Sequence, residues 1–290
     1  MTSPIALFNG KILPMDEIHI SPLDRGFIFG DGVYEVIPVY DGVPLHAREH
    51  FERLQRSMDE IRLVNPHTVE SWMELTHALL AHHPGNQSVY IQVTRGAPNK
   101  RDHVIPEKLT PTVFMMCYPL ASPSKESIEN GVKCVTASDF RWHKCNIKST
   151  SLLGNVLARQ ISADVGATET ILLRDGFVTE ASASNVFVVK DGVVAAAPRD
   201  NLILLGITYE LLVKLAGEGA FRFEVRPIPE SQLRSADEVW LSSSTKEVLA
   251  VTSIDGKPVG SGKPGALFKR MHALYQDYKA KLRKASTIAA

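Results

Sequence analysis

The sequence predicts a mixed α/β (α+β) protein of two domains. Its 290 residues, 44% of them hydrophobic, exceed what one small core needs and suit two domains of roughly 100–150 residues. β-branched runs bounded by turn residues alternate with segments of helical spacing, and a polar, serine-rich stretch interrupts them. We therefore expect an N-terminal α/β domain over residues 1–120, an interdomain linker over 121–130 and a C-terminal α/β domain over 131–290.

The first domain is expected to open as an antiparallel sheet. The runs KILPMDEIHISP and RGFIFGDGVYEVIPVYDGVPL contain short β-branched stretches, and Asp41-Gly42 marks a hairpin. Helical spacing begins at His46 and is stopped by Asn65-Pro66, and a second amphipathic helix covers roughly residues 68–81. Two buried strands follow, SVYIQVTRG and PTVFMMCYPL, with the charged loop GAPNKRDHVIPEKL between them.

The second domain is expected to mix strands and helices. The strand KCVTAS precedes Lys148, and SLLGNVLARQISADVG has the pattern of a helix. The runs TILLRDGFVTEAS and NVFVVKDGVVAAA predict hairpin strands. The LGIT segment with its helix, the strands FRFEVRPI and EVWLSSST, and a terminal amphipathic helix complete the order.

The composition disfavours several classes of protein. Lys plus Arg and Asp plus Glu both total 32, so no net charge attracts nucleic acid or an anionic membrane. The start MTSPIALFNGKILPMDE resembles neither a signal peptide nor an anchor, and no run approaches the ~20 apolar residues that span a bilayer. Three cysteines without a CxxC pair, and histidines without ligand spacing, favour neither disulfides nor a metal site. We expect a cytoplasmic protein with no metal, nucleic acid or membrane partner.

Lys148 is the first candidate for chemistry. It lies in NIKSTSLLGNVLA, where strand-like sequence ends and a helical pattern begins. A helix N-terminus disfavours a cation, so a lysine there is anomalous unless its charge is removed, as in an imine. The alternative is a solvated lysine near a helix start, and this position alone does not decide between the two.

Glu180 ends a strand in FVTEASASNVF and precedes small residues that can approach a ligand closely. A carboxylate here could face the pyridine nitrogen of a cofactor and keep it protonated, because an opposite charge in a poorly solvated site raises the pKa of that nitrogen. The alternative is an ordinary turn carboxylate before a serine-rich loop.

A phosphate site is predicted where the helix of NLILLGITYELL begins. Gly206 opens this helix, so free backbone N–H groups and the Thr208 hydroxyl could hold phosphate oxygens, although an ordinary helix start looks the same. The hydroxyl run from Ser242 to Thr245 could add donors. Arg53, in HFERL, could add positive charge, but a lone helical arginine is usually a surface residue.

Arg101 and His103 flank Asp102 in the charged loop, a spacing that puts both side chains on one face of an extended backbone. Together with a tyrosine hydroxyl, such a pair could hold a substrate carboxylate through charge-assisted hydrogen bonds. The alternative is two solvated loop side chains.

The segments DRGFIFGDGVYEV, HFERL, NIKSTSLLGNVLA, VTEASASNVF and LILLGIT occur in the order and spacing of the fold-type IV pyridoxal-phosphate enzymes, which the chain resembles over nearly its whole length. Within that superfamily it is most similar to the D-amino acid (D-alanine) transaminases. The resemblance implies a two-domain fold with pyridoxal 5′-phosphate (PLP) as cofactor and an active site between the domains.

The resemblance also implies roles for individual residues. Lys148 matches the catalytic lysine that holds PLP as a Schiff base, and Glu180 matches the partner of the pyridine nitrogen. The other implied cofactor-binding residues are Arg53, Leu204, Gly206, Ile207, Thr208, Ser243 and Ser244. Tyr34, Arg101 and His103 match the carboxylate trap of D-amino acid transaminases, in which the arginine and the histidine come from the partner subunit. A homodimer is therefore implied.

Two departures from the family pattern lie beside these residues. The usual IKSLNLL is IKSTSLL here, and the usual EGSSSN is EASASN, with Ala181 and Ala183. Because Lys148 and Glu180 are retained, these changes bear on substrate preference more than on transamination itself.

The implied function is ping-pong transfer of the amino group of a D-amino acid, D-alanine-like, to a 2-oxo acid such as 2-oxoglutarate or pyruvate. The alternatives within the superfamily are a branched-chain L-amino acid aminotransferase, an R-selective amine transaminase and, less favoured, an aminodeoxychorismate lyase. A noncatalytic binding module is the alternative from another class, and it predicts a colourless protein.

Overall fold

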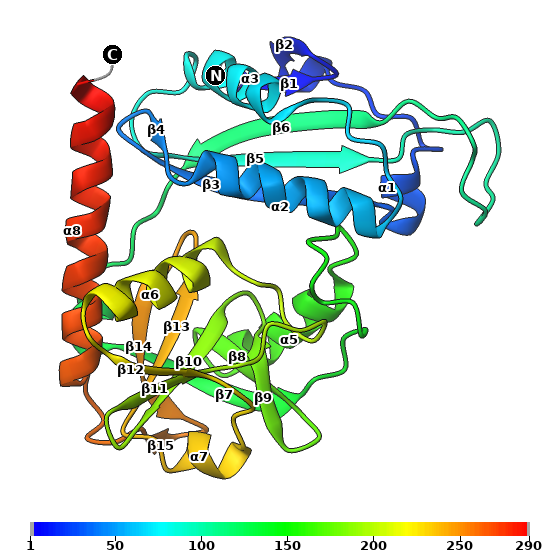
Figure 1. Cartoon of the computed structure of the whole chain (residues 1–290). Coiled ribbons are helices and arrows are strands. Elements are labelled where there is room, and N and C mark those ends of the chain that lie inside the picture. The colour runs from blue at the N-terminus through cyan, green and yellow to red at the C-terminus, as the bar shows by residue number, and fades with distance from the viewer. Residues whose placement is uncertain (1–2, 289–290) are drawn as a thin grey trace. The chain divides into compact units, whose positions relative to one another are not determined.

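The computed structural model describes the backbone of residues 3–288 and the side chains up to residue 282. The chain divides into two compact units (Figure 1). Unit 1 comprises the chain up to Leu120 together with Ile147–Leu152, and unit 2 comprises Ala121–Asn146 together with the chain from Leu153 onward.

Unit 1 is an antiparallel sheet with the strand order β2-β1-β6-β5-β3-β4. The strands are β1 (Ile5–Phe8), β2 (Lys11–Pro14), β3 (Gly32–Tyr40), β4 (Val43–Pro44), β5 (Gln87–Thr94) and β6 (Thr112–Pro119). The helices are α1 (Arg25–Phe29), α2 (Ala47–Glu60) and α3 (Val69–Leu80), with a 3-10 turn at Met15–Glu17. The helices expected near residues 46–64 and 68–81 are therefore confirmed.

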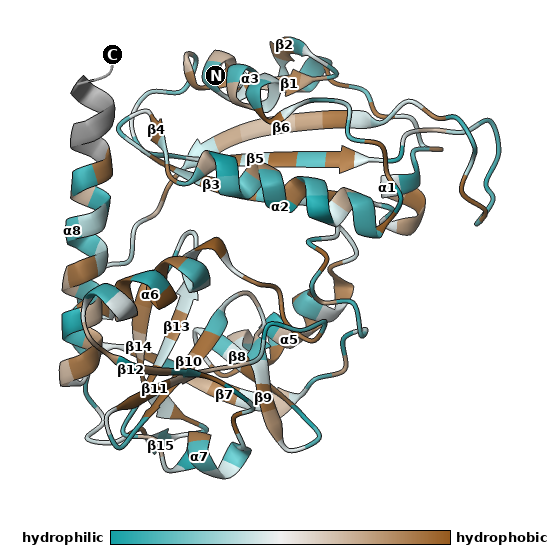
Figure 2. Ribbon diagram, viewed as in Figure 1, coloured by the Kyte–Doolittle hydropathy of each residue, from teal (hydrophilic) through white to brown (hydrophobic). Residues whose placement is uncertain are grey.

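Helices α2 and α3 pack on one face of this sheet. Phe51, Leu54 and Met58 recur at helical spacing on α2 and are fully buried. They join Trp72 of α3 and strand residues such as Ile37 in one core. Figure 2 shows hydrophilic and hydrophobic residues alternating along α2, as a helix with one buried face requires. Burial of each such side chain contributes about 1.5–3 kcal/mol.

Strand alternation along β3 separates its side chains onto two faces. Val33, Glu35 and Ile37 share the helix-covered face and are fully buried, whereas Tyr34 belongs to the opposite face. At the end of β3 the turn residues Asp41 and Gly42 have φ angles of 50° and 80°, and β3 pairs with β4. The expected hairpin is therefore confirmed.

Unit 2 is built on a mixed sheet with the order β12-β11-β10-β13-β14-β7-β8-β9, and β15 pairs with β14. The pairings of β11 with β12, β14 with β7 and β7 with β8 are parallel, and the other described pairings are antiparallel. The strands are β7 (Val132–Ser138), β8 (Glu169–Arg174), β9 (Phe177–Ala181), β10 (Asn185–Lys190), β11 (Val193–Ala196), β12 (Arg222–Val225), β13 (Glu238–Ser243), β14 (Glu247–Ile254) and β15 (Lys257–Pro258).

Both faces of this sheet carry buried apolar residues. Phe187 and Trp240 lie in a core with residues of α6 and α8, whereas their strand neighbours Val188 and Leu241 lie in a core that includes residues near α7. The helices are α4 (Lys125–Asn130), α5 (Leu153–Asp164), α6 (Ile207–Glu218), α7 (Glu230–Arg234) and α8 (Ala266–Ile288). In the part of the chain that the structure describes, no helix is long and apolar enough to cross a membrane.

The boundaries of the two units differ from those expected. Residues 121–130, expected as a linker, contain α4 and group with unit 2, where Ile128 packs against the core. Ile147–Leu152 was expected within the C-terminal domain, but it groups with unit 1 because its backbone pairs with β3. The strand β14 and the short helix α1 were not expected.

Candidate active site

Lys148 lies in a segment that unit 1 holds by hydrogen bonds. Its carbonyl accepts from the Tyr34 amide at 2.9 Å, and its amide donates to Ser57 Oγ at 3.2 Å. The next residue, Ser149, forms an isolated β-bridge with Val33. Helix α5 begins only at Leu153, so the expectation that Lys148 stands at a helix start is wrong.

The side-chain nitrogen of Lys148 lies over the ring of Tyr34. Nζ is 4.1 Å from the ring centroid, and the same ring stacks on Tyr90 at 5.7 Å. A cation over an aromatic face is stabilised by about 0.5–2 kcal/mol. Two predicted site residues that are far apart in sequence are therefore neighbours in unit 1.

A buried charged cluster lies on the helix-covered face of β3. Arg53 binds the fully buried Glu35 through Nε to Oε1 at 2.7 Å and Nη2 to Oε2 at 2.8 Å. His50 Nδ1 lies 2.7 Å from Oε2. Burial alone would raise the pKa of Glu35, but the charge of Arg53 and the hydrogen bonds with Arg53 and His50 hold it well below its usual range. An ionised carboxylate therefore orients Arg53, which is not a surface arginine.

Glu180 is the centre of a polar cluster in unit 2. Its Oε1 accepts from Arg141 Nη1 at 2.5 Å, and its Oε2 accepts from the Leu204 amide at 3.0 Å and from Asn185 Nδ2 at 3.2 Å. Burial raises the pKa of the Glu180 carboxyl to about 7, and Arg141 opposes that rise. A further positive group beside Glu180 would keep it ionised, so this carboxylate suits a protonated ring nitrogen.

Asp139 holds Arg141 from the other side. Arg141 Nε donates to Oδ1 and Nη2 to Oδ2, both at 2.9 Å, and Thr179 Oγ1 also donates to Oδ2 at 2.9 Å. The Arg141 guanidinium is thus fixed between two carboxylates, and its orientation toward Glu180 is determined by the fold.

Helix α6 begins with backbone donors that suit an anion. Gly206 is its N-cap, and among the described residues no side chain caps the helix. The N–H groups of a first turn have no acceptor within the helix, and they lie at the positive end of its dipole. A Cβ at Gly206 would lie 2.4 Å from Asn185 Oδ1, so glycine allows Asn185 to approach. Ile207 opens the helix and Thr208 is buried in its first turn.

The end of β13 adds hydroxyl groups. Ser242 Oγ is buried and has no hydrogen-bond partner within the described part of the chain. Ser243 Oγ accepts from the Lys246 amide at 3.1 Å, and Ser244 lies in the turn between them. A buried hydroxyl without a partner costs about 1–3 kcal/mol, which a ligand oxygen would offset.

These donors fit PLP. Its phosphate is an anion of the kind that helix N-termini and hydroxyls bind, and its ring nitrogen pairs with a carboxylate such as Glu180. Within unit 2, Asn185 donates to Glu180 and to the Leu204 carbonyl, and its Oδ1 lies beside Gly206 at the start of α6. Within unit 1, Lys148 and Arg53 lie near β3, on the segments described above.

Arg101 and His103 lie in the exposed loop between β5 and β6. The Arg101 Cζ atom is 4.8 Å from the centroid of the Phe29 ring, and the His103 ring is 5.1 Å from the same ring. In the described chain no hydrogen bond joins either side chain to Tyr34. The described contacts therefore join Arg101 and His103 to Phe29, and they do not join either residue to Tyr34.

Sequence reasoning missed the residues that orient the predicted ones. They are Glu35, His50, Asp139, Arg141 and Asn185. A signal existed for Glu35, because in GVYEVIPVY it occupies the same alternate positions as the buried apolar residues. No local signal existed for Arg141, whose contact with Glu180 spans 39 positions.

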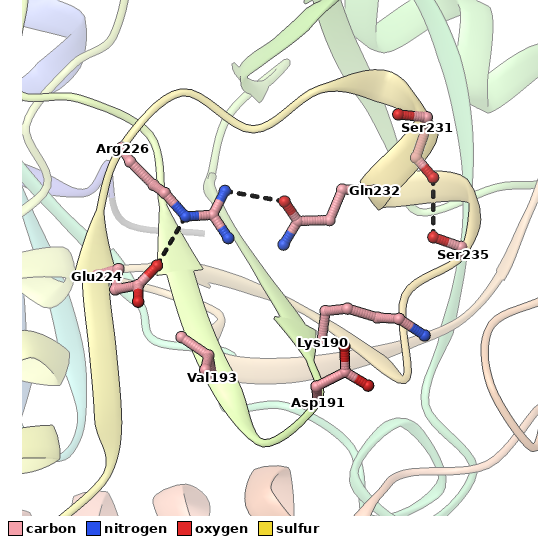
Figure 3. Close-up of a pocket in the computed structure, with 8 residues that line it drawn as sticks. All are labelled: Lys190, Asp191, Val193, Glu224, Arg226, Ser231, Gln232 and Ser235. Carbon is pink, nitrogen blue, oxygen red and sulfur yellow. Dashed lines mark hydrogen bonds and ion pairs between the residues drawn. The ribbon is translucent and has the colours of Figure 1, made fainter.

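A surface cavity of about 460 Å³ lies away from these residues in unit 2, beside the β10-β11 hairpin, the end of β12 and α7 (Figure 3). Arg226, which lines it, binds Glu224 at 2.7 Å and Gln232 at 2.8 Å. The cavity contains none of the predicted site residues, and its central cation is already paired, so we assign it no role.

Comparison with known proteins gives the family. A family model described as amino-transferase class IV matches residues 32–254. The chain belongs to the class IV aminotransferase family. This class IV aminotransferase is 41% identical to the D-alanine aminotransferase of Bacillus licheniformis, over 93% of the chain and 95% of that relative. It is 39% identical to the D-alanine aminotransferase of Listeria monocytogenes, over 93% of the chain and 94% of that relative.

Solved structures of similar fold agree with the expected fold class. The class IV aminotransferase matches the branched-chain aminotransferase of the archaeon Thermoproteus uzoniensis, solved with norvaline, at a TM-score of 0.85 and 25% identity, over 94% of each chain. It matches a fold IV-transaminase of Curtobacterium pusillum at a TM-score of 0.79 and 27% identity, over 91% of this chain and 93% of that one. The predicted fold-type IV class is thereby confirmed.

Proposed function

We propose that this chain is a PLP-dependent transaminase that moves the amino group of a D-amino acid, such as D-alanine, to a 2-oxo acid such as 2-oxoglutarate or pyruvate. The observation that carries the proposal is the buried Glu180 carboxylate, which Arg141 and the Leu204 amide hold in place. The 38–41% identity to D-alanine aminotransferases over 93% of the chain supports the choice of substrate.

Lys148 would hold PLP covalently through Nζ, and Glu180 would pair with its ring nitrogen. The phosphate would be held by Arg53 and by donors at the start of α6 and the end of β13, which are Gly206, Ile207, Thr208, Ser243 and Ser244, with Leu204 against the ring. When bound, PLP carries the amino group between substrates and accepts the electrons released at the substrate Cα.

Lys148 has a second task once the substrate is bound. As a free amine it would take the proton from the substrate Cα and return a proton in the reverse half-reaction, acting as general base and then acid. The face of Tyr34, 4.1 Å from Nζ, restricts the directions in which this amine can move. Holding the substrate carboxylate on one side decides which hydrogen on Cα meets Lys148, and hence the stereochemistry.

The carboxylate would be held by Tyr34 together with Arg101 and His103 of a second subunit. A homodimer is supported by the exposed apolar side chains of α5, where Leu153, Val156 and Leu157 are 71%, 59% and 52% exposed. Such a stripe favours burial against a second copy. The buried and unpaired state of all three cysteines supports a reducing, cytoplasmic setting.

Substrate assays test the function. Purified protein should be yellow, and it should convert D-alanine and 2-oxoglutarate to pyruvate and glutamate with ping-pong kinetics. Faster turnover of L-leucine or of an R-amine would replace the proposal with one of its alternatives. Pyruvate release from aminodeoxychorismate without an amino acceptor would indicate a lyase.

Borohydride reduction tests Lys148. Reduction of the wild-type protein should fix the cofactor on the peptide that contains Lys148, and Lys148→Ala protein should carry no fixed cofactor. A reducible adduct on another lysine in the variant would remove Lys148 from this role.

Subunit mixing tests the shared trap. At D-alanine concentrations far below the KM of Arg101→Ala, Lys148→Ala and Arg101→Ala chains should each be nearly inactive alone. Mixed equally, they should regain about a quarter of wild-type activity, because half the dimers are mixed and each has one intact site. If Arg101 serves its own chain's Lys148, mixing will restore nothing.

A further inference from the structure

We propose that Arg25, a buried residue of α1, is a positioning residue that sets the conformation of the β5-β6 loop and thereby the places of Arg101 and His103. The proposal rests on the proposed function, in which these two side chains hold the substrate carboxylate. Nothing in the sequence motifs assigned a role to Arg25.

The guanidinium of Arg25 binds three successive carbonyls of the loop. Nη1 donates to the carbonyl of Asp102 at 2.5 Å and, more weakly, to that of Val104 at 3.4 Å, and Nη2 donates to that of His103 at 3.3 Å. The Arg25 residue is only 4% exposed. Hydrogen bonds from a charged donor are stronger than neutral ones, so this group is a firm anchor for the loop.

Arg25 is itself fixed by the body of unit 1. Its Nε donates to Asp31 Oδ2 at 2.7 Å. Arg95 binds the same carboxylate through two bonds, Nε to Oδ2 at 2.8 Å and Nη2 to Oδ1 at 2.9 Å. The remaining described side-chain bonds of Arg95 go to the carbonyls of Ile61 and Arg62, which directly follow α2. Asp31 thus connects one arginine that holds the loop to another that does not.

Helix α1 contacts the trap side chains as well as the loop backbone. The Phe29 ring has Arg25 Cζ at 4.9 Å, Arg101 Cζ at 4.8 Å and the His103 ring at 5.1 Å. The bonds from Arg25 fix the backbone of residues 102–104, and Phe29 provides the surface on which both side chains rest. One turn of helix therefore orders backbone and side chains together.

In the described chain, the other polar contacts of residues 100–104 are local ones, from Lys100 Nζ to Asp102 Oδ2 at 3.4 Å and from the Val104 amide to Asp102 Oδ1 at 3.2 Å. Arg101 and His103 are exposed, and Val104 beside them is 72% exposed. Without the Arg25 bonds the loop would sample many conformations, and substrate binding would have to order it each time. Loss of these bonds should therefore raise KM for substrates that have a carboxylate, because only those substrates need Arg101 and His103 in place.

Arg25→Lys tests the proposal, with Arg95→Lys as its matched control. Lysine keeps the charge but cannot reach Asp31 and three carbonyls together. We expect Arg25→Lys to raise KM for D-alanine by about 10- to 100-fold with kcat changed by less than about 3-fold, and to leave kcat/KM for an R-amine without a carboxylate unchanged. Arg95→Lys disturbs the same Asp31, but it should leave the KM for D-alanine as in the wild type.

Hydrogen exchange gives a readout independent of activity. Backbone amides of residues 98–110 should exchange faster in Arg25→Lys than in the wild type or in Arg95→Lys. Unchanged exchange, or equal losses on D-alanine and the amine, would overturn the proposal. Arg25→Gln replaces Arg25→Lys if the latter does not fold.

A double variant separates this proposal from the function on which it rests. In an Arg101→Ala background, Arg25→Lys should raise KM for D-alanine by less than about 3-fold more, because its effect acts through the trap. Full additivity overturns the positioning role. Arg101→Ala without any effect on D-alanine contradicts the proposed trap instead, whatever Arg25 does.

Discussion

Arg141 donates to Glu180 across 2.5 Å inside unit 2, and both side chains are less than a tenth exposed. Asp139 binds the opposite edge of the same guanidinium through two bonds of 2.9 Å. The Asp139 carboxylate therefore neutralises the charge of Arg141 on the edge away from Glu180. Arg141 can thus orient Glu180 without a net positive charge that would compete with a protonated ring nitrogen.

Arg141→Lys should weaken PLP binding. A lysine donates from one nitrogen and cannot bind Glu180 and both Asp139 oxygens together. We expect PLP affinity to fall by about 10- to 100-fold, measured by titrating the cofactor-free protein with PLP. Arg174→Lys is the control, because Arg174 contacts Asp139 at 3.2 Å but no described bond joins it to Glu180. An equal fall in both variants would contradict a specific role for Arg141.

Glu180→Gln should change the pH dependence of stability in the PLP-free protein. The folded-state pKa of about 7 exceeds the ordinary value of 4.5, so folded chains keep a proton that unfolded chains release. Ionisation of Glu180 therefore costs stability as pH rises from about 4.5 to about 7, and the cost is constant above that. Glutamine does not ionise. Relative to the wild type, the free energy of unfolding of the variant should rise by about 3 kcal/mol between those limits in urea titrations. A pH-independent difference would show that Glu180 is not perturbed in this way.

Local patterns in the sequence predicted elements and motif positions, but not the contacts between distant segments. Glu180 was placed at the end of a strand, and β9 does end at Ala181. Its partner Arg141 is 39 positions away, and periodicity contains no information on such pairs. The same limit applies to Lys148, whose segment pairs with β3 rather than serving as the start of α5.

Helix α1 shows a different limit. Its signals are present, since Asp24 caps the first turn and Gly30 ends the helix with a φ of 66°. It has only five residues, and Gly26 lies inside it. Glycine weakens helices, so local propensity gave no support to a helix that Arg25 and its tertiary contacts stabilise.

Gly206→Ala should weaken PLP binding while leaving the rest of α6 intact. The added Cβ would lie 2.4 Å from Asn185 Oδ1, so Asn185 must move, and its bonds to Glu180 and to the Leu204 carbonyl would weaken. We expect about a 10-fold or greater loss of PLP affinity, measured by fluorescence titration.

Gly217→Ala is the matched control on the same helix. Apart from the adjoining backbone of α6, no atom of the described residues lies within 4 Å of a Cβ built there, so alanine should increase stability by about 0.5–1 kcal/mol without changing PLP affinity. If the two alanine variants bound PLP equally well, the proposed role of the α6 start would be wrong.

Glu169→Gln should destabilise the turn that joins Glu180 to Asn185. The Glu169 carboxylate is fully buried, and it accepts from the hydroxyls of Ser182 and Ser184 and from the Ala183 amide. Lys246 Nζ lies 2.8 Å from Oε1, which connects this turn to the segment that follows Ser243 and Ser244.

Glutamine would place an NH2 donor among these donors and would leave Lys246 without its counter-charge. Lys246 is 24% exposed, so water can solvate its charge in part, but a buried polar group left unsatisfied costs about 1–3 kcal/mol, and urea unfolding of Glu169→Gln should show a loss of that order. The control is Glu230→Gln, whose partner Arg234 is 36% exposed, and it should change stability by less than about 1 kcal/mol. Equal stabilities would mean that the serine hydroxyls and Lys246 re-pair around the amide. In that case, the turn between Glu180 and Asn185 would owe its conformation to the strands β9 and β10 rather than to Glu169.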